Sequence, residues 1–131
     1  QVAYELFRKA FSGPRWEALA ARGARVQRPL WASTSTKNLA YPDTLYVDTL
    51  IGTDTVNTLP AATLEAFEDH GTVARTVDAD PGAARGVLAA LTAAGVDLDD
   101  VSRQLEEEGV AAFAKSFDEL LASLTVKAAS L

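Results

Sequence analysis

Residues 33–37 have the clearest chemical character in this chain. Four hydroxyl side chains stand in succession over residues 33–36, and Lys37 follows them. Hydroxyl and backbone N–H groups donate hydrogen bonds, and the lysine ammonium adds one fixed positive charge. Donors of this kind around one cation suit an anion such as a phosphate group. The apolar run Pro29–Ala32 before them is typical of a buried strand, so the pattern predicts an anion-binding loop at a strand end.

Each candidate in this loop has alternative interpretations. Lys37 could act as an anion ligand, as a nucleophile or only as a solvated loop residue. A lysine nucleophile needs burial or a nearby positive charge, and a hydroxyl-rich loop predicts neither, so the anion ligand is favoured. Ser33 could face a ligand with its hydroxyl and N–H groups, or make a local turn bond. Ser35 and Thr36 are weaker candidates.

A second polar pair ends the next predicted strand. Asn57 and Thr58 close the run 54–58, and Pro60 then starts a helix. Ligands of α/β proteins bind at the carboxyl ends of parallel strands, so Asn57 and Thr58 are candidates for substrate contact. His70, the only histidine, lies in the last turn of that helix. A partly positive imidazole suits the helix dipole there, and we interpret His70 as structural.

The segments that carry these residues alternate between helix and strand up to residue 71. Alternation with short connections is typical of βα units in a parallel sheet, so the predicted fold class is α/β. In chain order, the expected elements are a helix over 1–11, a helix from Pro14 to Gly23, a strand over 28–33, a helix over 44–51, a strand over 54–58 and a helix from Pro60 to His70.

Capping residues mark several expected helix ends. Asp43 is the expected N-cap of the helix over 44–51, and Gly52 its C′ residue. After residue 72 the pattern is helical only. Asp80 is the expected N-cap of a helix that ends at Gly95, and Asp97 caps the next one.

Two apolar rows are expected on the later helices. Gly109 is expected to separate the helix that Asp97 caps from a third helix. The first row, on the helix that ends at Gly95, is expected to face inward and consists of Val87, Leu88 and Leu91. The second, on the third helix, repeats at three and four residues and consists of Val110, Phe113, Phe117, Leu120, Leu121 and Leu124.

Composition excludes several classes of function. The chain has 131 residues and a net charge of −6, which argues against a nucleic-acid or anionic-membrane partner. It has no cysteine and one histidine, so disulfides, thiolate metal sites and all-histidine zinc sites are impossible. No apolar run approaches the ~18 residues of a membrane helix, and a cytoplasmic location is expected.

Two strands are too few for the sheet that this pattern needs. Both strand runs are apolar enough to be buried on both faces, and a two-stranded sheet cannot do that. The chain has no methionine and begins at Gln1, within the expected helix over 1–11. We therefore expect it to be the C-terminal part of a larger α/β protein.

Many residues in fixed order resemble the C-terminal portion of bacterial transaldolases. The resemblance covers essentially the whole chain, with Leu39 in place of an expected proline as one departure. Its main elements are the string RPLWASTSTKN over 28–38, Tyr41, Leu45–Val47, Leu50–Gly52, Thr55–Thr58, Pro60, Thr63–Leu64, Ala66–Phe67, Asp69–Gly71 and Ser116–Leu121.

The resemblance implies a (β/α)8 barrel. Residues 1–78 would supply its last two βα units with the phosphate-binding loop, and residues 79–131 a C-terminal helical extension of the same domain. It also implies transfer of a dihydroxyacetone unit between sugar phosphates in the pentose phosphate pathway. The reaction proceeds through a lysine Schiff base, without a metal or organic cofactor.

The resemblance also assigns roles within the chain. Ser33 and Lys37 align with the residues that grip the sugar phosphate, whereas the catalytic lysine and the acid–base carboxylates lie on earlier strands. The segment alone is therefore expected to be inactive. Two alternatives remain open, another Schiff-base sugar-phosphate aldolase and a non-catalytic fragment or assembly module that forms homo-oligomers.

Overall fold

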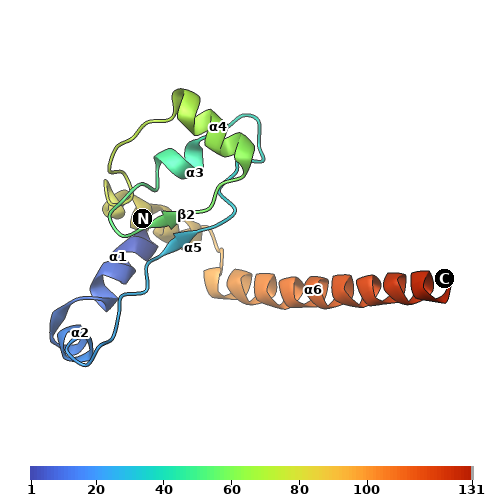
Figure 1. The fold of residues 1–131 in the computed structure, drawn as a ribbon. Helices are drawn as coiled ribbons and strands as arrows, with labels where there is room; N and C mark the ends of the chain where they lie inside the picture. Colours follow the sequence, from blue (N-terminus) through green and yellow to red (C-terminus); the bar gives the residue numbers. More distant parts are fainter. Residues whose placement is uncertain (131) are drawn as a thin grey trace. The chain divides into compact units, whose positions relative to one another are not determined.

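The computed structural model describes residues 1–130, which fall into two units. The first is Gln1–Gly86 and the second begins at Val87, within a helix that crosses the boundary. In chain order, the elements are α1 (Val2–Ala10), α2 (Gly13–Ala20), β1 (Leu30–Trp31), α3 (Leu45–Asp48), β2 (Val56–Asn57), α4 (Ala61–His70), α5 (Pro81–Ala93) and α6 (Leu98–Ala129) (Figure 1).

The two strands are parallel neighbours. Leu30 pairs with Val56 and Trp31 with Asn57, and the N–H of Thr58 lies 3.0 Å from the carbonyl of Trp31. The sequence predicted a parallel α/β arrangement, and this pairing confirms its parallel sense. The predicted strands, 28–33 and 54–58, are longer than the paired residues. Within residues 1–130 each strand has one neighbour, so the ladder ends where that neighbour diverges.

The core of the first unit forms where α1 meets the end of α3 and the segment before α5. Its fully buried centre is Val77, with Tyr4 and Val47 almost as well buried. The phenol of Tyr4 donates to the carbonyl of Thr53 at 3.0 Å. A Cβ on Gly52 would overlap a methyl carbon of Val77. Gly52 therefore permits the close packing of three segments that are distant in sequence.

This role replaces the one that the sequence predicted for Gly52. The helix α3 ends at Asp48 with Thr49 as its C-cap, so Gly52 is not its C′ residue. The prediction of Asp43 as N-cap is also wrong, because the N-cap is Thr44. The Asp43 carboxylate instead lies 2.9 Å from His70. The expected helix over 44–51 is thus a single turn.

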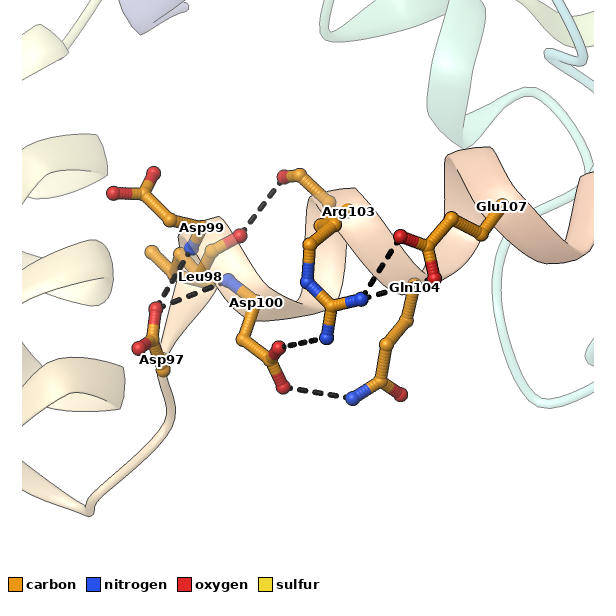
Figure 2. A network of polar contacts seen from close by, with 8 residues as sticks. Asp97, Leu98, Asp99, Asp100, Arg103, Gln104 and Glu107 are labelled. Carbon is orange, nitrogen blue, oxygen red and sulfur yellow. Dashed lines mark hydrogen bonds and ion pairs between the residues drawn. The ribbon is translucent and has the colours of Figure 1, made fainter.

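Helix caps in the later part of the chain agree with the sequence. The carboxylate of Asp80 accepts from the N–H of Ala83 at 2.8 Å. Gly95 adopts a φ of 87° after α5, which suits a glycine because it has no Cβ to clash. Asp97 caps α6 by accepting from the N–H groups of Asp99 and Asp100, as Figure 2 shows. Each of these three helix-end signals acts within a few residues of its own position, so the sequence alone predicts them.

An ion-pair network follows the cap of α6. The guanidinium of Arg103 contacts Asp100 at 2.5 Å and Glu107 at 2.9 Å (Figure 2). The amide of Gln104 also donates to Asp100 at 2.7 Å. All these side chains are largely exposed, so solvent screens the ion pairs and each one stabilises α6 only weakly.

The expected break at Gly109 is absent. The helix α6 continues through Gly109 for 32 residues, because a glycine within a helix costs only about 1 kcal/mol and removes no hydrogen bond. The predicted inward orientation of Val87, Leu88 and Leu91 is also wrong, since all three are exposed. Helical spacing predicts a shared face but not the surface that covers it. No helix described over residues 1–130 combines the length and apolar character required to cross a membrane.

Replacing Gly52 by alanine should destabilise the protein. The added Cβ would overlap the buried side chain of Val77, which has no space to move away. We expect a loss of about 1–3 kcal/mol in the free energy of unfolding, as for other overpacked cores. Urea denaturation of the intact protein measures this loss.

Gly86→Ala is the matched control, because a Cβ at Gly86 in α5 meets nothing within 4 Å. Alanine is the better helix former, so this variant should be as stable as the wild type or slightly more so. Equal stability of Gly52→Ala and Gly86→Ala would contradict the role assigned to Gly52.

Candidate functional site

Thr34 joins the ends of the two strands. It is 3% exposed, and its hydroxyl oxygen lies 2.8 Å from the side-chain oxygen of Asn57 and 2.9 Å from the carbonyl of Thr58. One hydroxyl proton is shared between these two acceptors. The loop after β1 is thereby fixed to the end of β2, which leads into α4.

Ser33 turns the chain into this loop. Its φ of 57° lies in the left-handed region, which is uncommon for residues other than glycine. The exposed Ser33 lines a hollow of about 310 Å³ together with Trp31, Tyr46 and Leu50. The backbone there is strained, and such strain is concentrated at functional sites.

Ser35 and Lys37 contact each other directly. The Nζ of Lys37 donates to the hydroxyl of Ser35 at 2.9 Å, and a hydroxyl that accepts in this way still has a proton to donate. Both residues line a second hollow, of about 380 Å³, between the loop and α4. The other residues that line it are Thr36, Asp43, Pro60, Ala62, Thr63 and Ala66.

The start of α4 forms one wall of this second hollow. Pro60 is its N-cap and makes no side-chain capping bond. The first N–H groups of a helix have no acceptor within the helix, and the helix dipole places partial positive charge there. Together with the Lys37 ammonium, the start of α4 makes this wall suitable for an anion.

A carboxylate and an imidazole complete the surroundings of the hollow. Asp43 lines the hollow, and its Oδ1 lies 2.9 Å from the Nε2 of His70. The Nδ1 of His70 lies 3.1 Å from Asp69. Hydrogen bonds to Asp43 and then Asp69 raise the pKa of His70 above its ordinary value. The hydrogen bond from His70 lowers the pKa of Asp43.

The structure distributes the predicted site residues over two hollows. Ser33 lines the first, and Ser35 with Lys37 lines the second. The amide of Asn57 bonds to Thr34 and, at 3.2 Å, to the carbonyl of Tyr46. The hydroxyl of Thr58 donates to the carbonyl of Trp31 at 3.1 Å. The polar atoms of Asn57 and Thr58 therefore hold the framework, and their contact with substrate stays a prediction.

A larger hollow lies away from this loop, along α1. It has a volume of about 730 Å³ and is lined by charged residues of both signs, among them Arg8, Lys9, Asp54 and Asp78. Mixed charge favours no single class of ligand, so we base the candidate site on the hollow at Lys37. Among residues 1–130, no three histidine, aspartate or glutamate side chains gather as a metal site requires.

Three contributors to the site were not identified from the sequence. Thr34 stands in a run of four hydroxyl residues, and nothing in the run distinguishes the buried one. Asp43 was assigned to a cap, and its partner His70 lies 27 positions away. A pairing of an aspartate with a histidine over such a distance leaves no local signal.

A family model and individual relatives both match this chain, and they indicate the same family. The family model for transaldolase/fructose-6-phosphate aldolase matches residues 1–124. A transaldolase of Frankia alni is 55% identical over 125 residues, which cover 95% of this chain and 34% of that protein. A transaldolase of Parafrankia sp. is 59% identical over 122 residues, covering 92% and 33%. The chain thus spans about a third of the length of these relatives.

Replacing Thr34 by valine should loosen the loop. Valine keeps the shape but removes the buried hydroxyl that bonds to Asn57 and Thr58, so two partly buried hydrogen bonds are lost. We expect a loss of about 1–3 kcal/mol in the free energy of unfolding. Urea denaturation measures the loss, and amide hydrogen exchange over residues 33–43 should accelerate.

Thr58→Val provides the comparison, because the carbonyl of Trp31 already accepts from the N–H of Thr58. Loss of the exposed Thr58 hydroxyl should cost clearly less stability than the change at Thr34. An equal cost for both variants would show that Thr34 has no special role.

Proposed function

The chain belongs to the transaldolase/fructose-6-phosphate aldolase family, and from this membership we propose that it supplies the sugar-phosphate site of a transaldolase. In the intact protein, this enzyme of the pentose phosphate pathway transfers a dihydroxyacetone unit between sugar phosphates through a lysine Schiff base. Lys37 and Ser35 bind the substrate phosphate, and Ser33 contributes from the neighbouring hollow. Asn57 and Thr58 are the proposed substrate contacts at the end of β2.

One observation carries the assignment of the phosphate site. The Lys37 ammonium and the Ser35 hydroxyl are 2.9 Å apart in the hollow that the start of α4 borders. A phosphate there would accept from the ammonium, the hydroxyl and the first N–H groups of α4. The family membership supplies the reason to expect a phosphorylated substrate in that hollow.

The family membership also suggests the fold of the intact protein. We propose that β1 and β2 are the last two strands of a (β/α)8 barrel, which is the architecture that the family membership suggests. In such barrels the loops after strands seven and eight commonly build a phosphate site, and the loop after β1 corresponds to the first of these. Residues 1–78 would belong to the barrel and residues 79–131 to its helical extension, in a protein of the cytoplasm.

Lys37→Ala should weaken binding of the substrate phosphate. The variant loses the charge that faces the hollow but leaves the fold intact, since Lys37 is exposed. A lost hydrogen bond to a charged group is worth about 1.5–3 kcal/mol, so KM for the sugar phosphate should rise by about 10- to 100-fold. Steady-state kinetics of the intact enzyme measure this, with inorganic phosphate as competitor.

Lys37→Arg is the control for this experiment, because it keeps the positive charge and should restore most of the affinity. An unchanged KM in Lys37→Ala, with unchanged inhibition by phosphate, would show that the phosphate binds elsewhere.

Borohydride trapping tests the assignment of chemistry. Reduction of the intact protein with its donor sugar phosphate should label one lysine, and we expect that lysine to lie outside these 131 residues. Peptide mass spectrometry identifies it. A label on Lys37 would make Lys37 the nucleophile and contradict its role as a phosphate ligand. Phosphate binding without any label would favour the non-catalytic alternative.

A further inference from the structure

The hollow proposed for phosphate contains a charge that opposes phosphate. Asp43 lines the same hollow as Lys37. A carboxylate beside a bound dianion repels it, because like charges repel even through water at separations of several ångström. One lysine and one aspartate together give the hollow no net charge, so something must reduce the effect of Asp43 if an anion is to bind well.

His70 lies close enough to Asp43 to reduce the effect of its negative charge. Its two ring nitrogens lie 2.9 Å from the carboxylate of Asp43 and 3.1 Å from that of Asp69. A neutral imidazole has one N–H, so one nitrogen would present its lone pair to a carboxylate oxygen. Only the imidazolium donates to both. The arrangement of two acceptors around His70 thus favours the charged form.

We propose that His70 is a positioning residue for the anion site, and that its positive charge neutralises and holds Asp43 so that Lys37 can bind an anion. This inference rests on the proposed role of Lys37 and Ser35. When His70 loses its proton, Asp43 recovers its full negative charge and the site weakens. His70 acts through Asp43, since it does not line the hollow itself.

The charged groups around His70 set the direction of the pH dependence. From the loop, His70 faces Asp43, with Lys37 beyond it in the hollow; from its own helix it faces Asp69. On α3, Asp48 is engaged by Thr44 and by the N–H of Thr72. The raised pKa of His70 keeps it charged to a pH above 6.5, its ordinary value. Anion affinity should therefore be high below that pH and fall as the pH rises through the raised pKa.

Sulfate is the probe of choice for this test. A phosphate ester changes its own charge near pH 6, whereas sulfate remains a dianion throughout. Isothermal titration calorimetry measures the affinity of the intact protein for sulfate from about pH 6 to about pH 9. This affinity should fall by about three- to tenfold as His70 deprotonates. Competition with sugar phosphate for the site identifies the sulfate signal as that of the substrate site.

Two variants separate the charge of His70 from its structural contribution. Asp43→Asn removes the opposing charge, so sulfate should bind at least as tightly as in the wild type and with little pH dependence. His70→Gln keeps a hydrogen-bond donor for Asp43 but no charge, so affinity should stay at the weak, high-pH level throughout. Glu68→Gln is the control for Asp43→Asn, because it also removes one negative charge, from an exposed position on α4. It should preserve the wild-type pH profile.

Different results would overturn the proposed phosphate site and the proposed role of His70. Sulfate binding that survives Lys37→Ala, or that sugar phosphate does not displace, would overturn the proposed phosphate site and this inference with it. Binding that depends on Lys37 but has the same pH profile in the wild type, His70→Gln and Asp43→Asn would overturn only the role of His70.

Discussion

The candidate site depends on one short connection between two strands. Parallel pairing of β1 with β2 extends over only two residue pairs, and the buried hydroxyl of Thr34 continues it past the last pair. Because of this contact, the chain that leaves β1 runs beside the start of α4. The hollow, with Lys37 on one side and α4 on the other, exists only while that connection holds.

Local signals allowed much of the fold to be predicted. Asp80, Gly95 and Asp97 act within a few residues of their own positions, and all three lie where the sequence placed them. The parallel sense of the strands followed from their alternation with helices. Gly109 was misread because a glycine permits a helix to end without requiring it. Strand length could not be predicted, since it depends on which residues find a neighbour.

The candidate site could be predicted only in part, because some of its contacts join residues that are distant in sequence. The grouping of Ser35 with Lys37 is local, and the sequence suggested an anion ligand there. Asp43 and His70 are joined across 27 positions, and each had a plausible local role that concealed the pairing. Long-range ion pairs between common residue types have no sequence signature, so only the folded chain brings them together.

The packing around Val77 has a consequence for biosynthesis. Gln1 and Tyr4 make their hydrogen bonds to residues 75 and 49 positions later in the chain, and Val77 fills the space beside Gly52. A ribosome adds about 5–20 residues per second, so α1 waits several seconds for its partners to be made. During that interval α1 lacks the hydrogen bonds that these later residues provide.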